Sequence, residues 1–161
     1  MSDGIYYDVM QVCLNGHLIT STANEYPSLR QKFCEDCGSA TTMECDSCHE
    51  TIRGDMHSDQ GMSIVNCIPK YCIDCGNPYP WQKSAIENLE AIIREGDLNA
   101  ADMDVVVLAL PDVVRDTPKT ELASVRLMKV MSRLGKPIYD VAINVISDIA
   151  SETAKKAMGL K

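Results

Sequence analysis

Residues 34–48, CEDCGSATTMECDSC, contain two Cys-x-x-Cys pairs close together, and two further ligand pairs flank them. The first is Cys13-Leu-Asn-Gly-His17 and the last is Cys72-Ile-Asp-Cys75. Pairs at this spacing point two ligand atoms at one metal ion, and eight ligands suffice for two tetrahedral zinc sites. Glycine follows two of the pairs, where the chain must turn sharply around a metal. The sequence therefore predicts two structural zinc ions per chain.

The order of the pairs favours a sequential arrangement of the ligands, in which each pair followed by glycine completes one site. One site would then consist of Cys13, His17, Cys34 and Cys37, and the other of Cys45, Cys48, Cys72 and Cys75. In the alternative, cross-braced arrangement, the first and third pairs bind one ion and the second and fourth pairs bind the other. The sequence alone leaves that alternative open.

Other uses of paired cysteines fit this pattern less well. A redox Cys-x-x-Cys occurs singly beside a βαβ unit, and no such unit is visible here. Thiolates also hold iron–sulfur clusters, but the histidine ligand favours zinc. Because four protein ligands fill each site, and a catalytic zinc keeps a position for water, the pattern predicts no catalytic residues and no enzymatic activity.

Three residues that could also bind a metal, one cysteine and two histidines, lie outside the pairs. Cys67 ends the strand-like segment 62–67, and we expect a small buried residue there, with a ligand or a reactive thiol as the alternatives. His49 directly follows Cys48 and is expected at the surface. His57 lies in the polar stretch 55–61, which predicts a solvated loop.

The composition divides the chain into two modules. All 8 cysteines lie between residues 13 and 75, and the whole chain has 1 Phe and 1 Trp. Residues 1–80 carry 4 Lys/Arg against 11 Asp/Glu, whereas residues 81–161 carry 11 against 12. A segment with few large apolar side chains builds little core, and metal is a common substitute. We therefore predict a double zinc-ribbon module over 1–80 and a helical module over 81–161.

The expected fold is α+β, with tandem zinc ribbons made of short β-hairpins followed by a bundle of about four helices. Strand patterns occur at residues 5–12, 17–22, 40–43 and 50–54. Helical periodicity covers residues 81–95, 99–114, 118–136 and 137–158, with Thr117 and Pro118 as the expected start of the third helix.

The expected helix 118–136 has a basic side. Lys119, Arg126, Lys129, Arg133 and Lys136 share an arc of about 100° on a helical wheel. A solvated outer face explains this arrangement most simply, and a docking stripe for the acidic N-terminal module or for an anionic partner is the alternative.

The sequence predicts a cytoplasmic protein. The first ten residues, MSDGIYYDVM, lack the basic flank and apolar stretch of a secretory signal. The longest apolar run, residues 105–110, is far too short to cross a membrane. In a reducing compartment, paired cysteines indicate metal binding before disulfides.

Several strings of the sequence resemble an uncharacterised bacterial zinc-ribbon family, the domain of unknown function DUF2321. They are YYDVMQVCLNGH at 6–17, FCEDCG at 33–38, TIRGD at 51–55, YCIDCGNPYPW at 71–81 and SETAKK at 151–156. The resemblance implies zinc ribbons with the same eight ligands. Asp46 stands where the family pattern commonly has proline, and this leaves the ligands intact. The family brings no established activity.

These observations favour a non-enzymatic zinc-ribbon adaptor or regulatory protein that contacts other proteins, with Tyr6, Tyr7, Arg53 and the basic helix as candidate contacts. Nucleic-acid binding through helix 118–136 is the alternative, but phosphate binding requires a basic surface, and the chain carries a net charge of −8. A cross-braced, ubiquitin-ligase-like module is a weaker third hypothesis. The oligomeric state stays open.

Overall fold

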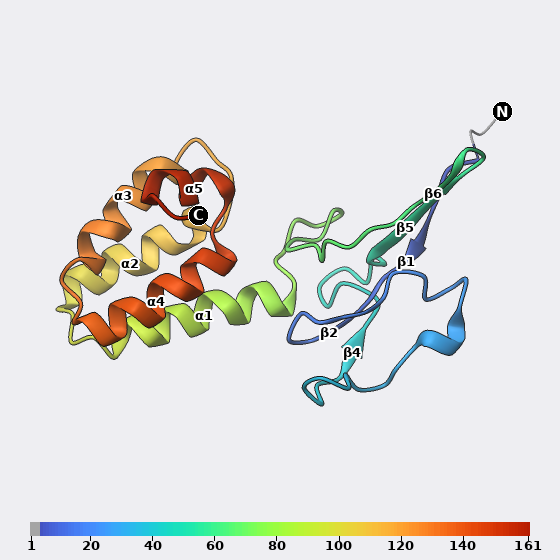
Figure 1. The fold of residues 1–161 in the computed structure, drawn as a ribbon, viewed down its shortest axis with the longest axis horizontal. Coiled ribbons are helices and arrows are strands. Elements are labelled where there is room, and N and C mark those ends of the chain that lie inside the picture. The colour runs from blue at the N-terminus through green and yellow to red at the C-terminus, as the bar shows by residue number, and fades with distance from the viewer. Residues whose placement is uncertain (1–3) are drawn as a thin grey trace. The chain divides into compact units, whose positions relative to one another are not determined.

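The computed structural model describes residues 4–161, so the first three residues of the predicted ribbon module lie outside it. The chain forms two compact units, Met1–Ser84 and Ala85–Lys161. The first contains short antiparallel strands and the cysteine clusters, and the second consists of helices (Figure 1). The predicted α+β class is confirmed.

Two small antiparallel sheets form the strand-bearing unit. One has the order β1-β5-β6, from β1 (Tyr6–Val9), β5 (Arg53–Ser58) and β6 (Gly61–Ser63). The other has the order β3-β2-β4, from β3 (Leu18–Thr20), β2 (Gln11–Cys13) and β4 (Thr41–Thr42). A short 3-10 helix, Pro27–Leu29, follows β3 along the chain.

The single strand predicted over residues 5–12 is divided between the two sheets. Met10 is fully buried at the division, and its N–H donates to the carbonyl oxygen of Ile52 at 2.8 Å. Nearby, a Cβ at Gly54 would lie 2.0 Å from the carbonyl oxygen of Ser21. Glycine is therefore required at the start of β5, because a larger residue would separate these two segments.

The core of this unit is small. Its buried members are Met10, Val12, Cys45, Ile52, Cys72 and Tyr79, and the indole of Trp81 packs against them. Two of these six side chains are predicted metal ligands. Apolar packing alone therefore contributes little stability to this unit.

Five helices follow in the described part of the chain, one more than the sequence suggests. They are α1 (Pro80–Arg94), α2 (Ala100–Val113), α3 (Thr120–Met131), α4 (Lys136–Ile149) and α5 (Glu152–Met158). The helix predicted over 137–158 is interrupted at Ala150, whose backbone is extended. The hydroxyl of Ser151 accepts from the N–H of Ala154 at 3.2 Å and begins α5, while the Ser151 N–H donates to Val113 at 3.0 Å. Because Ser151 caps the start of α5 and its N–H bonds to Val113, helix α4 cannot continue past Ala150.

Helix α2 confirms the helical interpretation of residues 99–114, and Asn99 caps it by accepting from the N–H of Asp102 at 2.8 Å. Pro111 lies in its last turn, and the helix ends two residues later. Helix α3 is shorter than the predicted 118–136. Lys119 rather than Thr117 occupies its N-cap position, and Lys136 begins α4, so Lys136 is not part of the basic face of α3.

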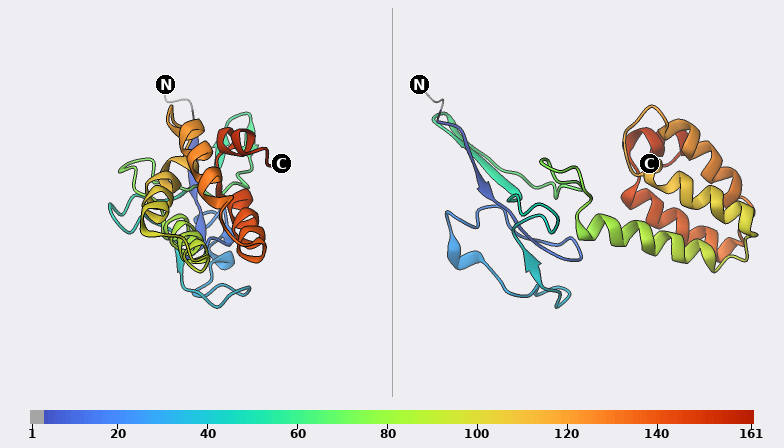
Figure 2. Two further views of the ribbon diagram at one scale, coloured as in Figure 1. Left: turned by 90° about the vertical axis from the view of Figure 1, so that its left-hand side faces the viewer. Right: turned by 180° about the vertical axis from the view of Figure 1, so that it is seen from behind.

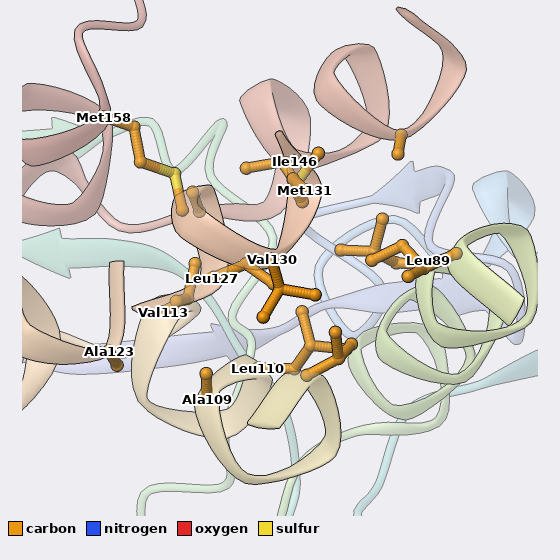
Figure 3. Close-up of a cluster of buried hydrophobic side chains, with 14 of the residues drawn as sticks. Leu89, Ala109, Leu110, Val113, Ala123, Leu127, Val130, Met131, Ile146 and Met158 are labelled. Atoms are coloured by element: carbon orange, nitrogen blue, oxygen red, sulfur yellow. The ribbon is translucent and has the colours of Figure 1, made fainter. Parts of the chain in front are cut away.

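The helical unit has a continuous apolar core. Figure 3 shows Leu110, Leu127, Val130, Met131 and Ile146 converging from α2, α3 and α4, and Figure 2 shows these helices from two further sides. Helix α3 packs against both α2 and α5. Within residues 4–161, no helix has the length and apolar character needed to cross a membrane.

Candidate metal centres

The first candidate centre joins the pair at the end of β2 with the pair at residues 34–37. Ligand atoms of Cys13, His17, Cys34 and Cys37 lie within 4.8 Å of one another. The Nδ1 atom of His17 lies 3.4 Å from the Sγ of Cys13 and 3.6 Å from the Sγ of Cys34, and the Sγ atoms of Cys13 and Cys37 are 3.8 Å apart. The thiols are free rather than joined in disulfides.

The second candidate centre consists of cysteines alone. Ligand atoms of Cys45, Cys48, Cys72 and Cys75 also lie within 4.8 Å of one another. The Sγ atoms of Cys45 and Cys75 are 3.7 Å apart, and those of Cys48 and Cys72 are 3.6 Å apart. The described residues therefore group the eight predicted ligands sequentially, and the cross-braced arrangement is wrong.

These separations fit one tetrahedral ion in each centre. With metal–sulfur bonds of about 2.3 Å and metal–nitrogen bonds of about 2.0–2.1 Å, tetrahedral angles place two sulfurs about 3.8 Å apart and a sulfur and a nitrogen about 3.6 Å apart. The observed values of 3.4–3.8 Å match that geometry. Each centre is compatible with metal binding through four protein ligands.

Three of the pairs have the same backbone geometry. At the Cys34 turn, the Cys34 N–H donates to the carbonyl oxygen of Ser39 and the Gly38 N–H donates back to that of Cys34, both at 2.8 Å. The turns at Cys45 and Cys72 repeat both bonds at 2.8–3.0 Å. An isolated β-bridge closes each turn, at Phe33–Ala40, Glu44–Thr51 and Tyr71–Pro78. The spacing of the cysteines thus fixes a knuckle that holds both sulfurs on one side.

The residue after each second cysteine adopts a left-handed conformation. Gly38 and Gly76 have φ values of 71° and 73°, as their place in the sequence predicts. His49 occupies the equivalent position in the third knuckle with φ 62°. It lies outside both ligand sets, its side chain is 72% exposed, and its Nδ1 lies 3.1 Å from Glu44. His49 is thus a surface residue, as expected, in a conformation that suits glycine better.

Replacing His49 with glycine should stabilise the second centre. A left-handed non-glycine residue costs about 1–2 kcal/mol, partly offset by the greater freedom of glycine in the unfolded chain, so we expect a net gain of about 0.5–1 kcal/mol. Denaturant unfolding followed by the fluorescence of Trp81 would measure it. His49→Ala is the matched control, because it removes the Glu44 contact but keeps the strain. A glycine variant no more stable than the alanine variant would contradict the argument.

Local hydrogen bonds favour thiolates in both centres. The backbone N–H of Ser39 and the side-chain amide of Asn15 lower the pKa of Cys37 to about 6. The backbone N–H of Cys75 and other hydrogen bonds lower the pKa of Cys72 to about 7. Although the Glu50 N–H favours its thiolate, burial and the neighbouring thiols raise the pKa of Cys48 to about 12. A second thiolate beside the first is therefore unfavourable until a cation balances their charge.

Two aromatic residues pack beside the centres. Trp81 stacks on Tyr79 with ring centroids 4.7 Å apart, and its indole N–H donates to the carbonyl oxygen of Pro69 at 2.8 Å. A Cβ at Gly16, in the first ligand turn, would lie 3.0 Å from the Cβ of Trp81. Burial and the charge of the Cys72 thiolate raise the pKa of Tyr79. The single tryptophan of the chain therefore reports on the surroundings of both centres.

Two residues singled out in the sequence lie elsewhere than expected. Cys67 is exposed rather than buried, because β6 ends at Ser63 and the Val65 N–H donates to the Asp55 carboxylate at 2.8 Å instead of extending the ladder. His57 lies in β5 rather than in a solvated loop. Its side chain is 13% exposed, and its ring stacks on Tyr6 at 4.6 Å. Neither residue belongs to a cysteine set.

A third group of metal-ligand types, Asp8, Glu25 and His57, was not found from the sequence. The Nε2 atom of His57 lies 3.3 Å from a Glu25 carboxylate oxygen. The Asp8 carboxylate accepts from the N–H groups of Asn24 and Glu25 at 2.9 and 3.1 Å. Although burial raises the pKa of Asp8, its backbone donors lower it below the usual value. The contact between His57 and Glu25 is an ion pair only when the imidazole is protonated, and the Asp8 carboxylate caps the turn at Asn24 and Glu25.

Comparisons with known proteins agree with the zinc-ribbon resemblance. Searches of curated proteins and of solved structures gave no match. Residues 6–158 match a family described as "Uncharacterized protein conserved in bacteria (DUF2321)", and the cysteine clusters fit its ribbons. Since the match covers nearly the whole sequence, the chain belongs to the DUF2321 family.

Proposed function

We propose that this chain is a zinc-binding adaptor, which holds two structural zinc ions and contacts protein partners without catalysing a reaction. The observation that carries the proposal is the pair of four-ligand sets, each spaced for a single tetrahedral ion. A catalytic zinc has three protein ligands and an open position, whereas four protein ligands are typical of structural zinc.

The chemistry of the ligands supports zinc over other metals. Cysteine thiolates exclude the hard cations magnesium and calcium, and tetrahedral sulfur and nitrogen ligands favour zinc. The separations of 3.6–3.8 Å between sulfurs suit one ion rather than a multi-iron cluster, whose cysteines bind different irons. A single iron bound by four thiolates would have similar geometry, so the metal must be measured.

Exposed tyrosine side chains on the two faces of the first sheet support protein contacts. Tyr6 and Tyr7 on β1 are 58% and 45% exposed, and the guanidinium of Arg53 lies 4.7 Å from the centroid of the Tyr7 ring. Tyrosine and arginine are enriched at the energetic centres of protein interfaces. Because Tyr6 and Tyr7 are consecutive on β1, they lie on opposite faces of the sheet, so Tyr6 and the pair of Tyr7 with Arg53 offer separate contacts to a partner.

Charge favours a protein partner over a nucleic acid. Residues 1–80 have a large excess of acidic groups, and the thiolates of two zinc sites add further negative charge. Nucleic-acid binding would rest on α3 alone, since phosphates repel an acidic surface. A low-salt titration with a generic duplex and a single strand would test this alternative, and binding that weakens steeply with salt would support it.

Metal analysis of the purified protein tests the zinc assignment. We expect native mass spectrometry to show two metal ions on each chain, and elemental analysis to identify both as zinc, because eight ligands form two closed sets. One ion per chain, or iron in place of zinc, would contradict the proposal. The same spectrum gives the oligomeric state.

The adaptor role needs a separate test. The tagged full chain would be used to recover binding proteins from a bacterial lysate, and each recovered protein would then be titrated with the purified chain. Saturable binding by at least one purified protein supports the adaptor role. A chain that carries two zinc ions but binds none of the recovered proteins saturably would contradict that role and leave the metal assignment intact.

A further inference from the structure

A surface groove runs between α2 and α3 in the helical unit. Its volume is about 450 Å³. Its lining includes the apolar side chains of Val105, Leu108 and Leu122, the two cations Lys119 and Arg126, and the carboxylate of Asp112. A second hollow of about 240 Å³ shares Val105 and Arg126 with the first and extends the groove along the same helices.

The lining of the groove leaves large aliphatic side chains in water. Leu108 is 76% exposed and Leu122 is 54% exposed, and Val107 and Val125 lie exposed on the same two helices. Helix α2 is apolar around its whole circumference between Val105 and Leu110. A helix of that kind is normally buried on all sides. Its exposed side therefore has the character of a surface that a partner covers.

The basic side chains predicted from the sequence border this groove. Lys119 and Arg126 line the first part, and Lys129 and Arg133 line the extension. Arg133 forms an ion pair with Asp102. Within residues 4–161, the other three take part in no ion pair. Because these three cations outnumber the one remaining carboxylate, that of Asp112, the lining of the groove is positive on a chain whose net charge is −8.

We propose that this groove binds an amphipathic helix of a partner protein, with aliphatic side chains on one face and carboxylates beside them. The inference rests on the adaptor role proposed above. Aliphatic anchors at positions i, i+3 or i+4, and i+7 would pack on Leu108 and Leu122, in the helix-in-groove mode. Flanking Asp and Glu residues would pair with Lys119, Arg126 and Lys129. The 14 residues of α2 span about 21 Å, room for a partner helix of about four turns.

Two other classes of partner fit the groove less well. A nucleic acid offers phosphates for the basic side chains but nothing for the aliphatic ones. An anionic membrane offers both, but its broad surface cannot enter a groove of about 450 Å³ between two helices. An acidic amphipathic helix satisfies the aliphatic and the basic side chains together, and this complementarity selects it.

Selection from a phage-displayed random peptide library, with the full zinc-loaded chain as bait, tests the proposal. We expect enriched peptides to combine aliphatic residues at helical spacing with Asp and Glu. As a synthetic peptide, the most enriched sequence should shift the amide resonances of α2 and α3 in the NMR spectrum. Enrichment of basic peptides, shifts confined to other helices, or no enrichment would overturn the proposal.

Variants with matched controls locate the binding site. Leu108→Ser with Leu122→Ser should weaken binding of the selected peptide at least about tenfold, because the apolar anchors are lost. Val141→Ser, at an exposed valine of α4, should leave it unchanged. Lys119→Glu with Arg126→Glu should weaken binding to a similar extent and reduce its salt dependence, whereas Lys156→Glu on α5 should not. Equal affinities in groove and control variants would overturn the proposal.

Parallel measurements separate this inference from the adaptor role and from other occupants. If a recovered partner protein binds the groove variants with the same affinity as the original chain, the adaptor role stands and the groove proposal fails. If the groove variants instead turn a dimer into a monomer, the groove is a contact between copies of this chain. The chain would also be tested for binding to phosphatidylglycerol vesicles and to a duplex. If it binds one of them and the groove variants abolish that binding, the groove proposal for a partner helix fails, and that ligand occupies the groove.

Discussion

Replacing Cys72 with serine should release one of two zinc ions and unfold the surroundings of the second centre, while the helices stay folded. Cys72 is buried, belongs to the small core of the ribbon unit and lies 3.6 Å from the sulfur of Cys48. Structural zinc contributes about 10–16 kcal/mol of binding free energy in zinc-finger peptides. The six-residue core beside it cannot compensate for that loss.

Metal content and Trp81 fluorescence measure this effect together. We expect native mass spectra to show one zinc ion in place of two, and the tryptophan emission to move to longer wavelength as the stack on Tyr79 opens. Far-ultraviolet circular dichroism should keep its helical signal, because the second unit has a core of its own. A chelator added to the original chain should reproduce the change in fluorescence.

Cys67→Ser is the matched control for that variant. Cys67 is exposed and belongs to neither ligand set, so the variant should keep both ions and the original emission. A Cys67 variant that loses an ion, or a Cys72 variant that keeps two, would show that the second set of ligands is wrong.

Leu127→Ala should destabilise the helical unit by about 2–5 kcal/mol. The Leu127 side chain is fully buried on α3, and Figure 3 shows it among Val113, Val130 and the other core residues. Truncation to alanine leaves a cavity in addition to the lost apolar transfer free energy, and the cost depends on how far the surrounding helices relax.

Urea unfolding followed by circular dichroism at a helical wavelength measures this loss. Leu122→Ala is the control, since it makes the same truncation on the same helix at a side chain that is 54% exposed. We expect the control to change the free energy of unfolding by less than about 0.5 kcal/mol. Equal losses in the two variants would contradict the assignment of these faces.

The two clusters of candidate ligands could be predicted because their signal is local. A Cys-x-x-Cys turn fixes its own backbone, and three such turns together with the Cys13–His17 pair suffice to name eight candidate ligands. Gly38 and Gly76 mark where the chain must turn. Helix α2 was also predictable, since its apolar run lies in a region without a second strand pattern. The sequential grouping needed the structure, because chain order alone does not decide which pairs meet.

The errors arise where distant residues decide the local structure. The break at Ala150 depends on a hydrogen bond from Ser151 to Val113, far away in the sequence. The exposure of Cys67 follows from the contact of Val65 with Asp55. The burial of His57 depends on its stack with Tyr6, which belongs to the neighbouring strand β1 but lies far from His57 in the sequence. Periodicity carries no information on such contacts.

The basic face of α3 shows a different limit. The helical wheel correctly groups Lys119, Arg126, Lys129 and Arg133, but it cannot show that α2 lies beside them and supplies Leu108. A helical wheel describes the faces of a single helix, whereas this groove is formed by α2 and α3 together.

The sequential order of the ligands has a consequence for biosynthesis. The first set ends at Cys37 and the second begins at Cys45, so the two sets do not interleave along the chain. Since a ribosome releases the chain from its N-terminus, all four candidate ligands of the first centre emerge before any of the second emerges. The two proposed zinc ions can therefore bind one after the other, without competition between the two sets for the first ion captured.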